Sequence, residues 1–407
     1  MSWNRGKIGQ HCEITSSKRI FYSEYVETGV PFYRSKEIIE TSQGQSISEP
    51  LFISQEKYEE IKEKFGVPGP GDMLLTSVGT IGIPYIVKQD DYFYFKDGNL
   101  TWFRNFDKEL LSEFLCYWIG SSEGYGILNN TTIGSSQKAL TIAALKNIEI
   151  PLPPLHIQKR IVDILSAYDN LIENNQKQIK LLEEAAQRLY KEWFVDLHFP
   201  GYKDTPVVNG VPEGWKKNRA DTFFDITIGK TPPRAESQWF TNMSDGIPWV
   251  SISDMGNSNV FLLETEEGLT NEATERHNVK IVPQGTVLIS FKLTVGRVAI
   301  TTTDMCTNEA IAHFYIQDDS QREYAYCYLK AFPYDTLEST SSISKAINSK
   351  IIKAMPFIIP DEIVLQKFSA QVQSLFELIK DRVIQNQQLR EARDRLLKKL
   401  MSGEVEV

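Results

Sequence analysis

Residues 161–193 read IVDILSAYDNLIENNQKQIKLLEEAAQRLYKEW, and the side-chain spacing in this stretch decides the rest of the fold. One set of side chains recurs at alternating intervals of four and three residues, the a/d spacing of a coiled-coil helix. The positions in this set are Ile161, Leu165, Tyr168, Ile172, Asn175, Ile179, Leu182, Ala186, Leu189 and Trp193. Pro151, Pro153 and Pro154 precede the stretch, and proline is excluded from a helix interior. The spacing therefore predicts a long helix that begins just after these prolines.

A second, less perfect stripe follows Pro360 and is interrupted by Arg382 and Arg393. Its positions are Val372, Leu375, Ile379, Asn386, Leu389, Leu396 and Leu400. Each helix is about 33 residues, or roughly 50 Å, long. A narrow apolar stripe with polar flanks suits a helix partner better than a sheet. We therefore expect the two helices to bury each other as an intramolecular pair; the alternative is that each packs separately on its own domain.

Asn175 is the polar member of the first stripe. A single polar residue at such a position can fix the register of two paired helices. Alternatively, Asn175 faces a docked partner protein, and the sequence does not separate the two interpretations.

The chain also resembles itself, because four blocks of the first half recur in the same order in the second half. The first pairing aligns Trp3 with Trp215 and Ile14 with Ile226. The four pairs are SWNRGKIGQHCEIT (2–15) with GWKKNRADTFFDIT (214–227), GVPFYRSKEI (29–38) with GIPWVSISDM (246–255), GDMLLTSVGTIG (71–82) with GTVLISFKLTVG (285–296), and QKALTIAALKNIEIP (137–151) with SKAINSKIIKAMPFIIP (344–360). The offset between matched residues drifts by only about ten positions, so the order indicates a duplication.

Each half begins with a mixed segment in which short alternating runs, such as TVLISFKL, lie between glycine and aspartate turns. Such runs predict strands with a few helices, and a long helix then closes each half. The predicted segments are 1–150, a mixed domain; 151–200, the first long helix; 201–360, a linker and the second mixed domain; and 361–407, the second long helix. The expected class is therefore α+β, with an internal repeat.

The linker after the first helix, DLHFPGYKDTPVVNGVPEGW, is rich in proline and glycine, so the second mixed domain is expected to start near Pro212. Trp193, Phe194 and Phe199 stand at the end of the first helix and the start of this linker. We expect them in a core between helix and linker rather than at a partner site.

The composition is that of an ordinary globular chain, with 41% hydrophobic and 24% charged residues among 407. No apolar run is long enough to cross a membrane and the first residues do not form a secretory signal, so we expect a cytoplasmic protein without a membrane segment. The four cysteines and five histidines show no ligand spacing, so no metal site or cofactor is expected. The net charge of −9 taken alone argues against a polyanion partner.

Motifs for catalysis are not found in the sequence. FDITIGKT (224–231) lacks the first glycine of a phosphate-binding loop, and Pro232 and Pro233 occupy the place of its helix. The chain has no N-P-P-[YF] tetrapeptide, of the kind that seats a flipped adenine in amino-methyltransferases, and no glycine-rich dinucleotide fingerprint. PDEIVL at Pro360 is not followed by the carboxylate-x-lysine of a nuclease, and no G-x-S-x-G elbow is present. An enzyme with an unrecognised site remains a third hypothesis.

The whole chain resembles the specificity (S) subunits of type I restriction-modification systems. The resemblance is carried by the duplicated plan and by four motifs: IPLPPLHIQKRIVDIL (150–165), LYKEWFVDLHFPGY (189–202), NGVPEGW (209–215) and RLLKKLMSGEV (395–405). It implies two target recognition domains, each reading one half of a bipartite, asymmetric site in double-stranded DNA. It also implies that the two long helices form an antiparallel coiled coil with a pseudo-twofold repeat.

Further expectations follow from the resemblance. The helices would set the spacing of the half-sites and dock two methyltransferase (M) subunits, and motor-nuclease (R) subunits would join that core. The chain itself would be non-catalytic and would need no cofactor.

The candidate DNA-binding residues are polar or basic and lie in corresponding turns of the two mixed domains. They are Arg34, Lys36, Ser77, Thr80 and Lys138 in the first domain, and Lys230, Arg234, Lys292, Arg297 and Lys345 in the second. Arginine can fork onto guanine, while lysine and serine suit phosphate. Lys138 and Lys345 match each other in the repeat, which indicates phosphate positioning. The alternative interpretation of each residue is that it is a solvated surface side chain that contacts no DNA.

The acidic balance has to be reconciled with a DNA partner. Our hypothesis is that this chain supplies base-edge readout with few charges, while partner subunits supply much of the phosphate contact. The rival hypothesis is a scaffold that does not bind DNA and presents two binding modules on a coiled coil.

Overall fold

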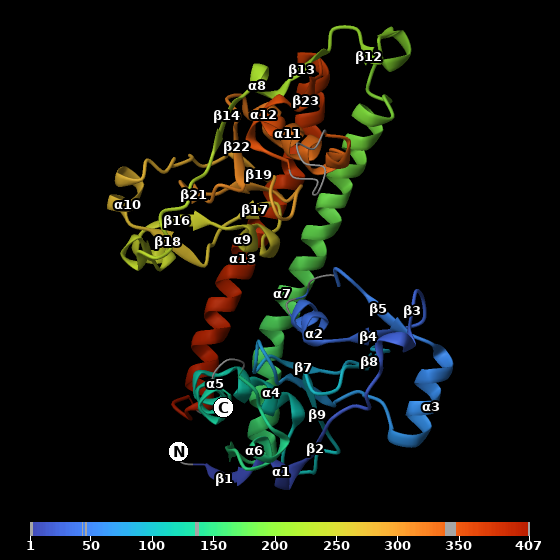
Figure 1. Cartoon of the computed structure of the whole chain (residues 1–407), viewed down its shortest axis with the longest axis vertical. Helices are drawn as coiled ribbons and strands as arrows, with labels where there is room; N and C mark the ends of the chain where they lie inside the picture. Colours follow the sequence, from blue (N-terminus) through green and yellow to red (C-terminus); the bar gives the residue numbers. More distant parts are fainter. Residues whose placement is uncertain (1–2, 43, 45–46, 135–137, 338–346, 406–407) are drawn as a thin grey trace. The chain divides into compact units, whose positions relative to one another are not determined.

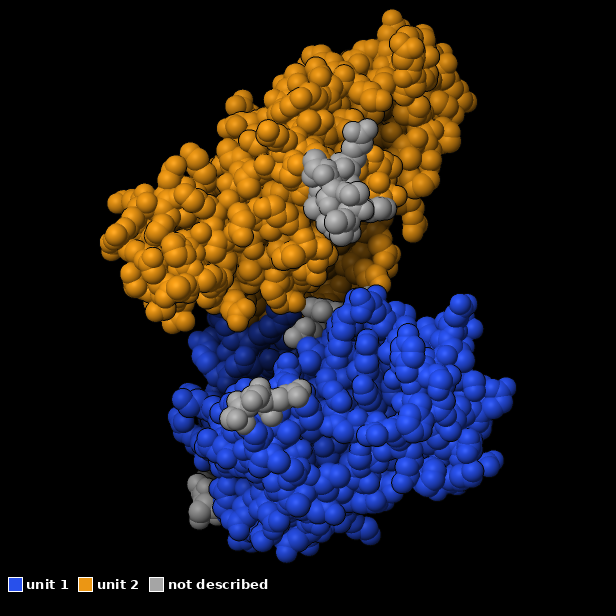
Figure 2. Space-filling view, in the orientation of Figure 1, with its two compact units in different colours: residues 1–173, 388–407 blue, residues 174–387 orange. Residues whose placement is uncertain are grey.

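The structure, a computed structural model, describes residues 3–42, 44, 47–134, 138–337 and 347–405. The chain forms two compact units, coloured separately in Figure 2. Unit 1 is Met1–Glu173 with Gln388–Val407, and unit 2 is Asn174–Gln387. The two long helices, α7 (Leu155–Tyr190) and α13 (Glu362–Met401), each contribute residues to both units (Figure 1). Each unit therefore contains one mixed domain and a part of each long helix.

Within the described residues, the mixed domain of unit 1 forms three sheets, with strand orders β2-β9-β6-β7, β3-β5-β4-β8 and β1-β10. The strands are β1 (Asn4–Lys7), β2 (Glu13–Thr15), β3 (Tyr25–Val26), β4 (Val30–Tyr33), β5 (Leu51–Ile53), β6 (Met73–Thr76), β7 (Pro84–Ile86), β8 (Tyr94–Phe95), β9 (Leu100–Arg104) and β10 (Glu149–Leu152). The helices are α1 (Ile8–His11), α2 (Ser35–Ser42), α3 (Gln55–Phe65), α4 (Ser112–Gly120), α5 (Ser122–Thr131) and α6 (Ile142–Lys146).

Unit 2 repeats this arrangement, with sheets β14-β22-β19-β20-β17, β15-β18-β16-β21 and β13-β23, and a separate hairpin β11-β12. Its strands are β11 (Val207–Val208), β12 (Val211–Pro212), β13 (Lys216–Arg219), β14 (Asp225–Ile228), β15 (Phe240–Thr241), β16 (Ile247–Val250), β17 (Phe261–Leu262), β18 (Glu267–Leu269), β19 (Val287–Ser290), β20 (Val298–Thr301), β21 (Cys306–Thr307), β22 (Ile311–Tyr315) and β23 (Pro356–Ile359). Its helices are α8 (Ala220–Phe223), α9 (Ile252–Asn257), α10 (Asn271–Arg276), α11 (Asp319–Ala331) and α12 (Ser349–Ala354).

The sheet register confirms the internal repeat. Ile14 of β2 lies opposite Phe103 of β9, and the matching Ile226 of β14 lies opposite Phe314 of β22. The main sheet of unit 2 differs by one added strand, β17, which pairs with β20. The expected α+β class with two similar mixed domains is therefore confirmed.

In unit 1 the two helices share a core with the mixed domain. Ile161 and Leu165 of α7 are fully buried in the same cluster as Leu397 and Leu400 of α13 and Trp118 of α4. Asp169 of α7 joins these layers, because it accepts hydrogen bonds from Tyr117 and Arg393, each at 2.5 Å. The helices thus bury one another, as expected, and they also pack on the domain.

In unit 2 the pairing continues through Ile179 of α7 and Val372 and Ile379 of α13, which are buried with the aromatic residues of the second domain. Asn175 lies in this seam and is only 5% exposed, and its side chain donates to Asn386 and Gln385 of α13. The structure therefore favours the register interpretation of Asn175 over a partner-facing one.

The end of the first long helix is also confirmed as a core element. Trp193 and Phe194 lie in a π-helical turn, Lys191–Val195, and both are buried. Phe199 is buried too, with its ring centroid 5.0 Å from that of Trp215. Within the described residues, no helix is both long and apolar enough to cross a membrane.

Candidate nucleic-acid interface

The candidate residues of unit 2 gather because of the strand directions of its main sheet. β14 and β19 both run antiparallel to the strand between them, β22, so they run parallel to each other and end on the same side. The segments that follow β14 and β19 (229–234 and 291–297) and the one that precedes β22 (308–310) therefore lie together. We call these three segments the binding edge of unit 2. Lys230, Arg234, Lys292 and Arg297 all belong to it.

Two cations of this edge, Lys292 and Arg234, act on one carboxylate, that of Glu309. The hydroxyl of Thr231 donates to Glu309, and this bond, assisted by the positive charges of Lys292 and Arg234, holds the pKa of Glu309 below its usual value. The ammonium group of Lys230 donates a hydrogen bond to the backbone oxygen of His277 at 2.6 Å. The edge is therefore polar and mixed in charge rather than uniformly basic.

Arg234 is held in a defined orientation. Its guanidinium lies over the rings of Phe240 and Trp249, 4.2 and 4.5 Å from their centroids. One of its nitrogens also donates to both oxygens of Glu267, at 2.7 and 2.9 Å. Stacking and pairing of this kind orient the planar donor group before any ligand arrives.

Arg297 is used inside unit 2. Its guanidinium donates to the backbone oxygen of Ile252 at 2.5 Å, and its backbone nitrogen donates to the hydroxyl of Ser290 at 3.0 Å. Gly256 packs so closely on this guanidinium that a Cβ there would clash with it. Arg297 thus ties the β19–β20 turn to α9.

Unit 1 has an equivalent edge. β2 and β6 both run antiparallel to β9, so the segments after β2 (16–22) and after β6 (77–83) and the one before β9 (97–99) lie together. These segments form the binding edge of unit 1, which contains Ser77 and Thr80. Lys138 lies beside it, because its backbone oxygen accepts from Gly79 at 3.3 Å.

The candidate side chains of unit 1 differ in how free they are. Thr80 is exposed, whereas Ser77 is 2% exposed and its hydroxyl lies 2.6 Å from that of Thr101. Lys138 is exposed and donates to the side-chain oxygen of Asn129 at 2.7 Å. Lys345, the candidate of the second mixed domain that matches Lys138, lies outside the described residues. Thr80 and Lys138 are therefore the side chains of this group available to a ligand.

Arg34 and Lys36 lie at the start of α2, which the Ser35 hydroxyl links to this edge through the backbone oxygen of Asn99 at 3.4 Å. The guanidinium of Arg34 pairs with the fully buried Glu37, which raises the pKa of Arg34. Lys36 is exposed and pairs with Glu49 at 2.9 Å. Arg34 thus compensates a buried charge, while Lys36 stays on the surface.

The structure adds residues that the sequence analysis missed. Lys18 occupies the same place in unit 1 as Lys230 in unit 2, on the segment that leaves the first strand of the main sheet. Arg19 pairs with Asp97 at 3.0 Å, and the neighbouring Phe21 and Tyr22 are 61% and 89% exposed. The signal was present in the repeat, because the register that aligns Ile14 with Ile226 also aligns Lys18 with Lys230.

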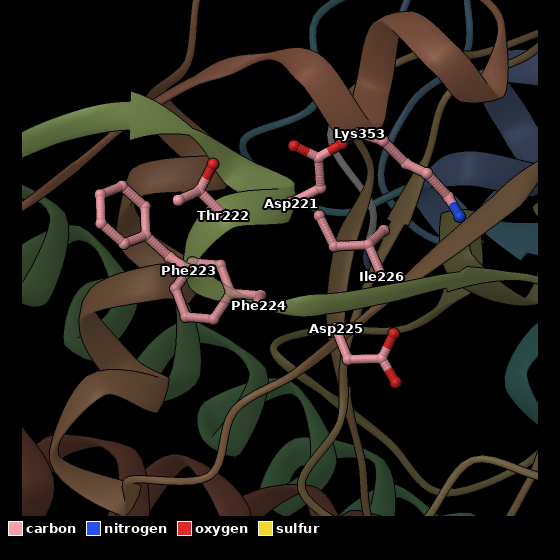
Figure 3. A pocket seen from close by; sticks show the side chains of 7 residues that line it. All are labelled: Asp221, Thr222, Phe223, Phe224, Asp225, Ile226 and Lys353. Atoms are coloured by element: carbon pink, nitrogen blue, oxygen red, sulfur yellow. The ribbon is translucent and has the colours of Figure 1, made fainter.

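The pocket of unit 2 that is lined by Asp221 and Asp225 lacks the arrangement of a catalytic site. A shallow pocket in unit 2 is lined by residues 221–226 and Lys353 (Figure 3). The carboxylates of Asp221 and Asp225 point away from each other, and Asp221 already pairs with Arg219 at 2.6 Å. The pocket therefore does not place two acids on one reacting group.

In unit 1, one side-chain ligand atom each of His11, Asp107 and Glu109 lies within 4.8 Å of the others, although His11 is distant from the two acids in the sequence. The Nδ1 atom of His11 is hydrogen-bonded to Asp107 at 2.9 Å, and the backbone nitrogens of Glu109 and Leu110 donate to Asp107. Asp107 thus serves as the cap of a turn, and its contacts are those of a structural residue.

Two copies of one mixed domain, each with a polar edge and a share of two paired helices, define a two-module recognition protein. The chain belongs to the type I restriction modification DNA specificity domain family, whose model matches residues 2–184 and again residues 212–390. The resemblance seen in the sequence is therefore confirmed.

Relatives agree with this assignment. The chain is 29% identical to the type I restriction enzyme MjaIX specificity subunit of Methanocaldococcus jannaschii, over 83% of this chain and 78% of that one. It is 24% identical to the HindI specificity subunit of Haemophilus influenzae, over 65% of this chain and 71% of that one. The crystal structure of the S subunit from M. genitalium shares the fold, with a TM-score of 0.55 at 15% identity over 98% of this chain and 96% of that one.

Proposed function

We propose that this specificity subunit reads a bipartite, asymmetric site in double-stranded DNA, with the binding edge of each unit facing one half-site. The observation that carries the proposal is the gathering of the candidate residues. Lys230, Arg234, Lys292 and Arg297 in unit 2, and Ser77 and Thr80 in unit 1, lie in segments on the same side of equivalent sheets. Two similar but non-identical edges suit two different half-sites.

The charge pattern supports base readout more than backbone binding. Arg19 and Arg234 of the two edges each pair with a carboxylate, as does Lys36 beside the unit 1 edge, so few cations, Lys292 among them, remain for phosphate. Held carboxylates and guanidinium groups can instead accept from cytosine and donate to guanine. In this proposal, partner subunits supply much of the phosphate contact, which reconciles DNA binding with the net charge of −9.

The long helices are proposed to set the spacing of the half-sites and to dock two M subunits, which R subunits then join. Large apolar side chains on the outer surface of the helices support the docking role. Leu171 and Leu181 of α7 and Ile363 and Leu378 of α13 are all exposed and are available to such a partner. Within this assembly the chain acts without catalysing a reaction and without a cofactor.

The proposal is tested by expressing the chain with its neighbouring M subunit and mapping methylated adenines by single-molecule sequencing. We expect one motif made of two defined halves around an unspecified gap. Methylation without such a motif, or the absence of any methylation, would contradict the proposal and favour the scaffold hypothesis. Binding of the isolated chain to its own site is the second measurement. Nanomolar affinity at near-physiological salt without M subunits would refute the role given to the partners in phosphate contact.

A further inference from the structure

One residue of the unit 2 binding edge, Leu293, combines exposure with an unfavourable backbone conformation. It lies at the tip of the β19–β20 turn and is 92% exposed, the largest value among the large hydrophobic side chains of the described residues. Its φ angle is +61°, in the left-handed region that residues with a Cβ rarely adopt. Leu293 also belongs to none of the hydrophobic clusters of the described residues. The side chain of Leu293 therefore gains no burial within unit 2 that would offset this backbone conformation.

The repeat shows what the turn requires. Gly79 occupies the matching position in unit 1 with φ +78°, and each turn is closed by an equivalent backbone hydrogen bond. In unit 1 the nitrogen of Gly82 donates to Thr76 at 2.8 Å, and in unit 2 that of Gly296 donates to Ser290 at 2.9 Å. Glycine satisfies the left-handed position without a steric cost. A leucine at this position has a less favourable backbone conformation than glycine. We therefore look for a contact of its side chain that accounts for the leucine.

A second leucine with positive φ provides a comparison. Leu197, at φ +58°, packs against the core of unit 2, so burial offsets its strain. Leu293 obtains no such compensation within unit 2. Residues that the surrounding structure holds in sparsely populated backbone conformations cluster at active sites and ligand clamps.

The neighbours of Leu293 identify the ligand. Lys292 precedes it and is exposed, and the same edge carries Lys230, Arg234 and Glu309. An apolar tip among cations and a hydrogen-bonding carboxylate matches the groove of a duplex better than an apolar protein surface. The 5-methyl of thymine is the apolar group that a base pair presents in the major groove.

We propose that Leu293 is a specificity-determining residue whose side chain contacts a thymine methyl in the half-site read by unit 2. This inference rests on the proposed function and deepens it. The fixed turn holds the leucine at the tip of the edge, so its side chain enters the groove while Lys292 remains beside the backbone. The contact selects thymine at one position.

The test uses Leu293→Gly in the complex with the M subunit. This variant copies Gly79, so it is expected to fold and to melt at the same temperature as the parent or slightly higher. We expect the methylated motif to lose its thymine preference at one position of one half, with the other half and the gap unchanged. Val208→Asn, at an exposed apolar residue in the β11–β12 hairpin, is the matched control and should leave the motif unchanged.

A binding measurement isolates the methyl. In duplexes with uracil in place of that thymine, the parent complex should bind roughly threefold to tenfold more weakly, whereas Leu293→Gly should bind both duplexes equally. An unchanged motif in Leu293→Gly, relaxation at a position that is not an A·T pair, or equal sensitivity of both proteins to uracil would overturn the inference. If the parent complex itself shows no bipartite motif, the proposed function fails, and that outcome is separate from these.

Discussion

The side chain of Asn175 donates a hydrogen bond to that of Asn386, 2.9 Å away and 211 residues later in the chain. Both asparagines are almost fully buried, at 5% and 3% exposure, and they occupy equivalent positions of the repeated helices. Equivalent positions of an antiparallel pair meet at one level only. The two asparagines therefore mark that level, and any slip of the helices would bury their amides without partners.

Replacing one asparagine tests this relationship. Asn175→Ala should lower the free energy of unfolding by about 1–3 kcal/mol, because the amide of Asn386 loses a partner inside the seam. Asn175→Leu with Asn386→Leu should recover most of that loss, since an apolar pair leaves no amide unsatisfied. Urea denaturation of the parent, Asn175→Leu, Asn386→Leu and the double leucine variant gives the coupling energy. Purely additive effects would show that the two residues act independently.

The cations proposed to touch phosphate should reveal themselves through salt dependence. Lys292→Gln and Lys138→Gln are each expected to weaken binding of the M-subunit complex roughly threefold to tenfold and to reduce the slope of log affinity against log salt by about 0.9. Lys217→Gln and Lys108→Gln, at exposed lysines outside the binding edges, are the matched controls. If the slope of log affinity against log salt were equal in all four variants, Lys292 and Lys138 would not contact phosphate.

His313 predicts a pH dependence for unit 2. Its ring is fully buried between the hydroxyls of Thr227 and Thr307, at 2.8 and 2.6 Å, and burial lowers its pKa to about 3. In the unfolded chain the pKa of His313 is about 6.5. Below that pH the imidazole is therefore protonated in the unfolded state but stays neutral in the folded state. The stability from neutral His313 is thus complete above about pH 6.5 and falls as the pH drops towards 3.

Between pH 7.5 and 5.0 this effect amounts to about 2 kcal/mol. His313→Gln should be less stable than the parent at pH 7.5 but should lose about 2 kcal/mol less on acidification, as measured by urea denaturation at both values. The control is His156→Gln, at an exposed histidine, which should keep the pH dependence of the parent. The same loss in His313→Gln as in the parent would assign the pH dependence to other groups.

Domain exchange tests the assignment of half-sites. Residues 212–360 include both β13 and β23, which pair along four residues each, so this segment can be replaced without dividing that ladder. A chain carrying the corresponding segment of another family member should methylate a motif with one new half and one old half. Sequencing of methylated DNA gives the answer directly. Changes in both halves would contradict independent reading by the two units.

The helices as a ruler give the last prediction. Arg382 donates to Gln178 at 2.9 Å and to Gln385 at 3.3 Å, so these two glutamines lie near one level. Seven residues inserted after each preserve the a/d phase and add about 10.5 Å. We expect an unspecified gap longer by about three base pairs, with both half-sites unchanged.

The added pairs also turn the duplex by roughly 100°, so the variant is expected to methylate more slowly than the parent. An insertion in one helix only should break the pairing and lower the melting temperature, which makes it the control. An active variant that keeps the original gap would show that the helices do not set the spacing.

Much of the fold was accessible from the sequence because periodicity and repetition are properties of the chain itself. The a/d spacing from Ile161 onward predicted α7, and the pairing of Trp3 with Trp215 predicted two domains of similar topology. The added strand β17 had no counterpart in the first half, so the repeat gave no signal for it. The packing of the helices on the domains as well as on each other was also not foreseen, because a stripe of apolar residues does not say how many partners it has.

The candidate site was predictable in its location but less so in its side chains. Turns that match in the repeat do lie at equivalent edges, since strand order follows from topology. Whether a polar side chain is free depends on contacts distant in sequence. Ser77 meets Thr101, and Arg297 meets Ile252, neither of which its neighbours in the chain reveal. Lys18 was missed although the repeat aligns it with Lys230.

The composition of unit 1 has a consequence for how the protein is made. This unit needs Met1–Glu173 and also Gln388–Val407, whereas unit 2 has all of its residues once position 387 has left the ribosome. Leu397, Leu400 and Met401 form one wall of the core that also holds Ile161 and Leu165. During translation, the domain synthesised first is therefore the last to be completed. The core of unit 1 therefore stays incomplete, and open to solvent and to chaperones, until residues 388–401 have been synthesised.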